Sequence, residues 1–204
     1  VMPMTLAQPR YLKNKFGGWW YFCFPIATVK TWPFPFFVRG DDSYFSLSND
    51  FDIITMPGVV AHQEDFFTKQ TPLTVYLDMR YHIVHHLTFE GLDIGSAKLQ
   101  RMIARYFNRF NNSYHYESAR AILHALEDVL SEPRFWEENV DMAEKRKQIA
   151  ALTDREKLRQ DFDVDISKLA RHSRNRNKGP LVKRVRQLTG NGHLVPESFF
   201  YKKG

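Results

Sequence analysis

The segment after Thr71-Pro72 constrains the fold more than any other part of the chain. A hydroxyl side chain at the N-cap, followed by proline at the first helical position, is a strong helix start. We expect this helix to run to about His86. Its apolar residues are Leu73, Val75, Tyr76, Leu77, Met79, Ile83 and Val84. They occupy almost every side of a helix rather than one face, which predicts a helix buried deep among other elements.

Downstream of this helix, apolar residues recur at spacings of three and four, which is the period of an amphipathic helix. One such face runs from Leu99 to Phe110 and another from Ala119 to Leu130. We expect further helices within residues 134–150 and 154–162. This part of the chain is therefore predicted to be helical.

The first ninety residues differ, because most of the phenylalanine and tryptophan residues lie there. Aromatic and β-branched runs bounded by glycine and proline favour strands. The predicted strands cover residues 19–24, 36–38, 51–56 and 59–61, with short helices over residues 4–15 and 42–49. The sequence therefore predicts an α/β fold over residues 1–90, a helical extension over residues 91–162 and a basic segment over residues 163–204.

The composition limits the class of protein. A hydrophobic content of 43% and an aromatic content of 15% indicate a packed globular chain rather than a disordered one. No stretch approaches the roughly 20 apolar residues of a membrane-spanning helix, and the start of the chain lacks the pattern of a signal peptide. The single cysteine, Cys23, is typical of a reducing compartment, and its apolar neighbours predict a buried thiol. We therefore expect a cytoplasmic protein.

Basic residues gather near the carboxyl end of a chain whose net charge is +6 and whose pI is about 9.4. From Ser167 to Val195 there is no acidic residue, while eight lysine and arginine residues fall there. Such a segment suits lipid headgroups, a polyanionic glycan or nucleic acid; the alternative is a solvated tail. No RNA- or DNA-binding motif accompanies it, so we expect a peripheral membrane contact and no nucleic acid.

Two adjacent carboxylates, Asp41 and Asp42, follow the predicted strand at residues 36–38. Carboxylates in such a place are costly unless they meet water, a metal or a ligand, and α/β proteins place their sites at the carboxyl ends of strands. Their repulsion and partial burial would raise the pKa of one of them and make it a usable general base. The alternative is that one of them only caps the helix that follows.

Histidines offer a second kind of candidate. His62 ends the last predicted strand, where an imidazole is a reasonable ligand for a divalent metal; the alternative is a structural histidine. His82, His85 and His86 share one helical face, but no glutamate completes a zinc-protease pattern. Neither set decides a function by itself.

Trp19 and Trp20 follow a pair of glycines near the amino end. Indole rings stack on the C–H faces of sugars, and they are also ordinary core material. Both interpretations are open from the sequence.

Four segments occur in a fixed order: Gly18-Trp19-Trp20, Pro33-Phe34-Pro35-Phe36-Phe37-Val38-Arg39-Gly40-Asp41-Asp42-Ser43-Tyr44, Met56-Pro57-Gly58-Val59-Val60-Ala61-His62 and Tyr76-Leu77-Asp78-Met79-Arg80-Tyr81. Together they resemble the second half of family 2 glycosyltransferases. The resemblance is closest to the bacterial galactofuranosyltransferases that build cell-envelope polysaccharides. It covers about residues 5–90 and extends more loosely to about residue 130.

This resemblance implies a GT-A fold and inverting transfer from a UDP-sugar that is bound with Mn²⁺ or Mg²⁺. Asp42 resembles the general base that takes the proton of the acceptor hydroxyl, and Asp41 resembles the neighbour that binds the acceptor sugar. Trp19 and Trp20 resemble the aromatic pair beside the acceptor. His62 resembles the histidine that completes the metal site. A base and a metal at the diphosphate are the two aids that such a transfer needs.

The chain also departs from the family pattern. Gly40 stands where the relatives have tryptophan, and Asp78, a substrate-binding candidate, stands where galactofuranosyltransferases have histidine. The donor that the resemblance implies is a UDP-sugar, either UDP-galactofuranose or one with another sugar. No Asp-X-Asp string ends an apolar strand, so we expect a nucleotide-binding half to precede these residues and the 204 residues alone to be inactive. The other open function is a non-catalytic module that binds anionic lipid or polyanion through its basic segment.

Overall fold

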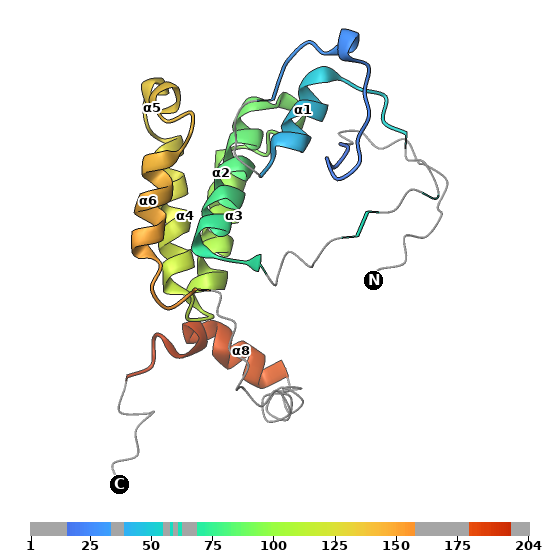
Figure 1. The fold of residues 1–204 in the computed structure, drawn as a ribbon. Coiled ribbons are helices and arrows are strands. Elements are labelled where there is room, and N and C mark those ends of the chain that lie inside the picture. The colour runs from blue at the N-terminus through green and yellow to red at the C-terminus, as the bar shows by residue number, and fades with distance from the viewer. Residues whose placement is uncertain are drawn as a thin grey trace.

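The computed structural model describes residues 16–33, 39–54, 58, 61–62, 69–157 and 180–196. Over these residues the chain forms seven α-helices and no strand. The α-helices are α1 (Asp41–Asn49), α2 (Pro72–Thr88), α3 (Ser96–Asn111), α4 (Tyr116–Val129), α5 (Pro133–Glu138), α6 (Ala143–Leu152) and α8 (Pro180–Leu188). The 3-10 helices are η1 (Ile26–Thr28), η3 (Glu90–Leu92) and η4 (Gly190–Gly192). Helices α2, α3, α4 and α6 lie side by side, with α1 next to α2 (Figure 1).

The α/β prediction, including the GT-A fold that the resemblance implies, is wrong for the described residues. Residues 19–24 and 51–54, expected as strands, have no regular structure. Their aromatic rings gather around Phe45 of α1, where the ring centroids of Phe24 and Phe51 lie 4.8 and 5.4 Å from its own. An extended segment without a neighbouring strand has no partner for its backbone hydrogen bonds. The expected elements at residues 4–15 and 36–38 lie outside the described residues, as do residues 59–60 of the strand expected over 59–61, and Ala61 has no regular structure.

The side chain of Asn49 fastens the loop formed by residues 16–33 to the carboxyl end of α1. The amide oxygen of Asn49 accepts hydrogen bonds from the backbone N–H groups of Lys30 and Thr31 at 2.6 and 2.9 Å. Its amide nitrogen donates to the carbonyl of Thr31 at 2.8 Å. Cys23 in this loop is exposed, so the prediction of a buried thiol is wrong, because the loop lies on the surface of α1 rather than inside a sheet.

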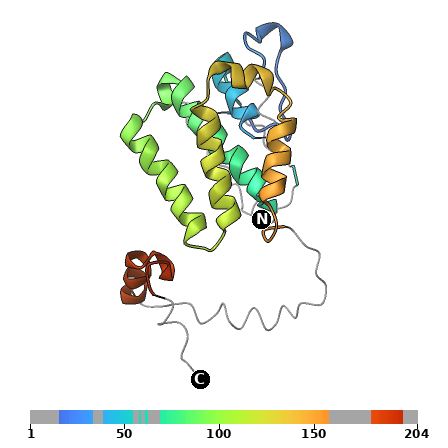
Figure 2. The same ribbon diagram turned by 90° about the vertical axis from the view of Figure 1, so that its left-hand side faces the viewer.

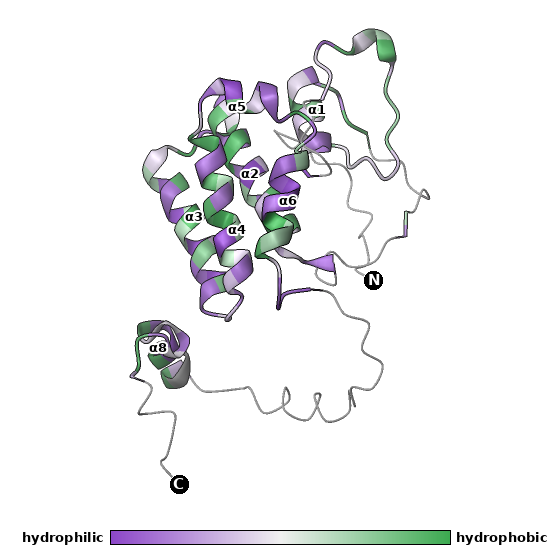
Figure 3. Ribbon diagram, turned by 60° about the vertical axis from the view of Figure 1, so that its left-hand side comes forward, coloured by the Kyte–Doolittle hydropathy of each residue, from purple (hydrophilic) through white to green (hydrophobic). Residues whose placement is uncertain are grey.

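Helix α2 is confirmed as the buried helix that the sequence predicts. The Thr71 hydroxyl accepts a hydrogen bond from the N–H of Thr74 at 3.3 Å, and the Thr74 hydroxyl accepts one from the N–H of Thr71 at 2.8 Å. Helix α2 packs most extensively against α4, whose alanines allow close approach. The core residues are Val75, Tyr76, Leu77, Met79, Ile83, Phe110, Ala119, Ala121, Ile122, Ala125, Met142 and Ile149. Helices α3 and α4 are also confirmed, and the hydrophobic sides of the bundle face inward (Figure 3).

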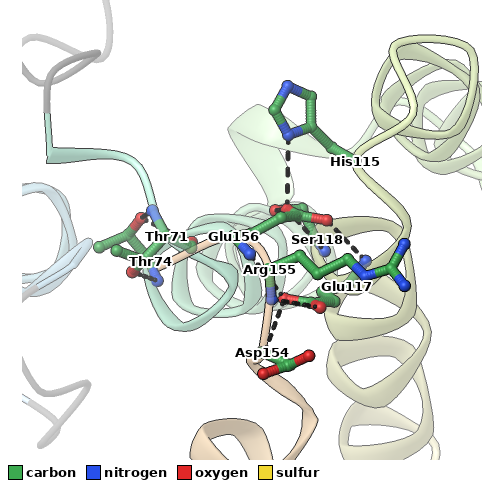
Figure 4. A network of polar contacts seen from close by, with 8 residues as sticks. All are labelled: Thr71, Thr74, His115, Glu117, Ser118, Asp154, Arg155 and Glu156. Atoms are coloured by element: carbon green, nitrogen blue, oxygen red, sulfur yellow. Dashed lines mark hydrogen bonds and ion pairs between the residues drawn. The ribbon is translucent and has the colours of Figure 1, made fainter. Parts of the chain in front are cut away.

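The chain after α6 returns to the start of α4 through two glutamates (Figure 4). The Glu156 carboxylate accepts hydrogen bonds from the N–H groups of Glu117 and Ser118 at 2.7 and 3.2 Å, which are otherwise unpaired donors of a first helical turn. The Glu117 carboxylate accepts from the N–H groups of Asp154, Arg155 and Glu156 at 2.9–3.0 Å. This exchange holds these residues in a bend, so the helix predicted from residue 154 is absent over 154–157.

A charged network crosses the core between α2, α4 and α6. Asp128 accepts a hydrogen bond from the Tyr76 hydroxyl and pairs with Lys145 at 2.6 Å. The Arg80 guanidinium contacts the Met142 sulfur at 2.8 Å and lies over the Tyr76 ring, 5.3 Å from its centroid. Burial lowers the pKa of Arg80 and raises that of Tyr76. Charges withdrawn from water need such partners, so the network joins three helices at one level.

Helix α8 lies at the end of the bundle where α3 turns into α4 (Figure 2). None of the described helices is long and apolar enough to cross a bilayer.

Candidate functional site

The start of α1 meets the middle of α2 at Gly40. The backbone of Gly40 has φ +81° and ψ −1°, a left-handed conformation that favours glycine. A Cβ atom at this position would lie 2.6 Å from both Cβ and Cγ of Tyr81. A tryptophan here, as in the resembled family, would not fit. The departure at Gly40 is therefore what allows the two helices to approach.

Asp41 and Asp42 occupy the first turn of α1, directly after this contact. The N-cap is Gly40, which has no side chain, so neither aspartate is the N-cap residue. Asp42 Oδ1 accepts a hydrogen bond from the N–H of Ser43 at 2.7 Å. Burial raises the pKa of the Asp42 carboxyl, the Ser43 amide opposes this rise, and the charge of Asp41 adds to it. Asp42 therefore accepts a proton more readily than an ordinary aspartate.

An ion pair links the residue before Gly40 to helix α2. Arg39 Nη1 donates to Asp78 Oδ1 at 2.8 Å, and both side chains are partly buried. Burial raises the pKa of Asp78, while the charge and hydrogen bond of Arg39 oppose the rise. The ion pair therefore fixes the Asp78 side chain on the part of α2 that lies next to the start of α1.

Two tyrosines connect the acidic groups electrostatically. Burial raises the pKa of Tyr81 to about 12, and the charges of Asp78 and Asp42 act in the same direction. Burial and the charge of Asp78 also raise the pKa of Tyr106 on α3. Asp42 and Asp78, which lie on different helices, therefore act on one shared region.

Sequence reasoning missed Arg39, Tyr81 and Tyr106 as members of this group. The signal for Tyr81 was its position three residues after Asp78, which places both on one side of a helix. Arg39 directly precedes the glycine and the acidic pair. Nothing in the local sequence points from Tyr106 to the site, because its contact depends on how α3 packs.

The histidines of α2 serve the packing of the helix. His85 is buried and hydrogen-bonded to the backbone of Gly40; burial and the charge of His82 lower the pKa of His85 to about 4. His86 Nδ1 lies 2.6 Å from the carbonyl oxygen of Leu92. Across the described ranges, no three His, Cys, Asp or Glu side chains gather in a group that could hold a metal ion.

The loop that carries Trp19 and Trp20 is attached one helical turn beyond Asp42. The N–H of Gly17 donates to the Ser46 hydroxyl at 3.2 Å, and that hydroxyl donates to the Asp42 carbonyl oxygen at 2.9 Å. Trp19 packs in part against α1 and is 41% exposed, and Trp20 is 60% exposed. The tryptophan pair is therefore surface rather than core.

The structure does not bring His62 into a metal group. Its side chain is exposed, and residues 59–60 and 63–68 on either side lie outside the described part of the chain. Mn²⁺ and Mg²⁺ need several oxygen or nitrogen donors around one point, and the described residues do not provide such a set with His62.

Comparison with protein-family models, with curated proteins and with solved structures gives no match for this chain. The geometry itself offers a carboxylate with a raised pKa, a second acidic group paired with arginine, and exposed indoles fastened to the same helix. Carboxylates bind hydroxyl groups and accept their protons, while indoles cover the C–H faces of sugar rings.

Proposed function

We propose that this chain supplies the acceptor-binding and base-supplying part of an inverting sugar transferase. In the reaction, an acceptor hydroxyl oxygen bonds to the anomeric carbon of a UDP-sugar, and the bond from that carbon to the diphosphate breaks. The electron pair of the broken bond leaves with UDP, and the hydroxyl proton moves to Asp42. The acceptor is a cell-envelope glycan or a lipid-linked glycan, so the protein would act in polysaccharide biosynthesis.

The observation that carries this proposal is the environment of Asp42. A general base works best when its pKa approaches the working pH. Burial moves the pKa of Asp42 in that direction, and the charge of Asp41 adds to the rise, while the hydrogen bond from the Ser43 amide opposes it. Partial burial also removes water that would otherwise solvate the carboxylate and compete with the acceptor hydroxyl.

Asp41, Trp19 and Trp20 are assigned to acceptor binding. Asp41 lies beside the base in the first turn of α1, where its carboxylate can accept hydrogen bonds from neighbouring sugar hydroxyls. The indoles are exposed on a loop that is bonded to α1 one turn away. Asp78 is assigned to the substrate as well, held in place by Arg39.

The donor, with UDP-galactofuranose as the first candidate, carries a diphosphate whose charge Mn²⁺ or Mg²⁺ neutralises in this class of reaction. The described residues form no metal group. Following the family that the sequence resembles, we assign the donor and its metal to a separate nucleotide-binding half. The steps assigned to this chain are acceptor contacts and one proton transfer.

Acceptor binding is tested on the 204-residue chain itself. Galactofuranose oligosaccharides are added to ¹⁵N-labelled protein, and the indole N–H signals of Trp19 and Trp20 are followed by NMR. We expect both signals to shift with a saturable dependence on concentration, because the rings contact the sugar. Indole signals that stay unchanged up to the solubility limit would remove the acceptor assignment.

Catalysis is tested by sugar transfer from labelled UDP-sugars, using the protein expressed from its complete gene. Asp42→Asn is expected to lower kcat by about 10²–10⁴, the usual contribution of a general base, with little change in acceptor KM. Asp52→Asn, at an exposed position in the loop after α1, is the matched control and should transfer normally. Normal turnover by Asp42→Asn would show that Asp42 is not the base.

A further inference from the structure

One face of α3 carries positive charge only. Between Asp93 and Glu117 the chain has no acidic residue, and its basic residues are Lys98, Arg101, Arg105 and Arg109. Spacings of three and four place these four on one side of the helix, and all four are exposed. Within the part of the chain that the structure describes, the ion pairs of α2, α4, α5 and α6 include none of them. We call this set the α3 basic stripe.

Helix α8 adds an exposed apolar face. Leu181, Val185 and Leu188 are spaced four and three apart, so they lie on one side of the helix. Leu181 is 76% exposed, Val185 52% and Leu188 73%. Arg184 and Arg186, on the same helix, are exposed too. An aliphatic face with basic neighbours is the composition of a helix that lies in a membrane interface.

Polar contacts hold α8 next to the carboxyl end of α3. The Tyr114 hydroxyl donates to the carbonyl of Asn191 at 2.7 Å, and the Asn191 amide donates to the carbonyl of Asn112 at 2.6 Å. The rings of Tyr114 and His193 stack with centroids 4.8 Å apart. Figures 2 and 3 both show α8 beneath the end of the bundle where α3 turns into α4. The α3 basic stripe and the apolar face of α8 therefore belong to neighbouring elements.

We propose that α3 and α8 dock this protein on a bilayer that contains anionic phospholipid. The α3 basic stripe faces the headgroup phosphates, and the three aliphatic side chains of α8 enter the boundary between headgroups and acyl chains. A nucleic acid would be attracted by the same charges but would gain nothing from exposed leucine and valine, because its grooves and phosphates are polar. This inference goes beyond sugar transfer and does not depend on it.

The test is co-sedimentation of the 204-residue chain with vesicles of phosphatidylcholine, alone or mixed with phosphatidylglycerol. We expect binding to the mixed vesicles only, weakened by salt, which screens charges beyond about 3 Å at 1 M. Arg101→Gln with Arg105→Gln should lower the partition coefficient at least about tenfold. Leu181→Ser with Leu188→Ser should lower it at least as much but keep the salt dependence of the wild type, because its charge is unchanged.

The matched control removes two positive charges elsewhere. Arg134→Gln with Lys147→Gln changes exposed residues of α5 and α6 that pair with Glu138 and Glu144 at 2.6 and 2.7 Å, and it should bind like the wild type. Circular dichroism confirms that each variant keeps its helices. The proposal is overturned by equal binding to both vesicle types, by equal losses in the control and stripe variants, or by retention of an oligonucleotide without retention of vesicles.

Discussion

Gly40 and Tyr81 lie so close that a Cβ atom on the glycine would stand 2.6 Å from the Cβ atom of the tyrosine. Asp42 follows two residues later on α1, and Asp78 precedes Tyr81 by three residues on α2. The charges of both carboxylates act on Tyr81. The relative position of the proposed base and the Arg39–Asp78 pair therefore depends on a contact that only glycine permits.

Gly40→Ala should lower the free energy of unfolding by about 2–4 kcal/mol. About 1 kcal/mol comes from forcing alanine into a positive-φ conformation, and the rest from displacing Tyr81. Urea unfolding measures the total. Gly190→Ala separates the two contributions, because Gly190 has φ +55° but its Cβ would meet other atoms only at 3.7 Å or more. If both variants lost the same amount of unfolding free energy, the contact between Gly40 and Tyr81 would not be tight.

The helical part of the fold could be predicted because its signals are local. The Thr71-Pro72 start acts within one turn, and the capping bonds of Thr71 and Thr74 are present as expected. The apolar spacing of α3 and α4 depends only on the helical period. A long, strongly periodic segment can therefore be predicted as a helix without knowing which element packs against it.

The amino-terminal half could not be predicted in the same way, because strand preference depends on context. Phe24, Phe45 and Phe51 are residues that favour strands. In the structure their rings instead pack against one another around α1, so they are shielded from water without a sheet. For the site, the sequence predicted the acidic pair and Asp78. It also placed Arg39 beside the acidic pair and Tyr81 one helical turn after Asp78, but their contacts with the site follow from the approach of α1 to α2, which the sequence does not reveal.

Asp128→Ala should destabilise the protein by about 3–5 kcal/mol, measured by urea unfolding. The substitution leaves the Lys145 ammonium group without its partner at 2.6 Å and removes the acceptor of the Tyr76 hydroxyl. The control is Glu127→Ala at the preceding residue of the same helix, where the exposed carboxylate pairs with His124. This variant should lose no more than about 1 kcal/mol of unfolding free energy.

A double variant tests whether Asp128 and Lys145 are energetically coupled. Adding Lys145→Met to Asp128→Ala removes the unpaired charge and should restore part of the lost stability. If the double variant were as unstable as the sum of the two single variants, Asp128 and Lys145 would not be coupled.

The Glu117–Glu156 exchange makes stability sensitive to acid. Burial would raise the pKa of Glu117, but the backbone N–H groups of Arg155, Glu156 and Asp154 lower it more, to below its ordinary 4.5. A carboxylate with a depressed folded-state pKa stabilises the fold above the unfolded pKa and loses this contribution as pH falls through the folded one. Unfolding free energies should therefore decline below about pH 4.5, and decline less in Glu117→Gln.

The control for this titration is Glu137→Gln, at an exposed position on α5, which should follow the acid dependence of the wild type. The amide NMR signals of residues 154–156 should move together with the Glu117 titration, since their N–H groups donate to that carboxylate. Amide signals that stay fixed while stability falls would assign the acid sensitivity to another group.

His85 should add a separate loss of stability on acidification, which begins at a higher pH than the loss due to Glu117. Burial, with the charges of His82 and His86, lowers the pKa of His85 from 6.5 to about 4, although its hydrogen bond with Gly40 opposes the shift. Because the unfolded chain binds this proton more readily, stability should be intact above pH 6.5 and fall between pH 6.5 and 4, by up to about 3 kcal/mol. Imidazole ¹⁵N spectra measure the titration directly, and a His85 midpoint near 6.5 would contradict it.

Asp41→Asn should change two kinetic quantities at once if Asp41 adjoins the base and also binds the acceptor. Burial raises the pKa of Asp42 and Asp41 adds to the rise, so removing the charge of Asp41 should move that pKa downward. Transfer requires ionised Asp42, so the acidic limb of kcat/KM should move to lower pH, while acceptor KM rises. Asp52→Asn should change neither quantity. An acidic limb that stays in place would mean that Asp42 does not accept the acceptor proton, and a KM that stays in place would mean that Asp41 does not hold the sugar.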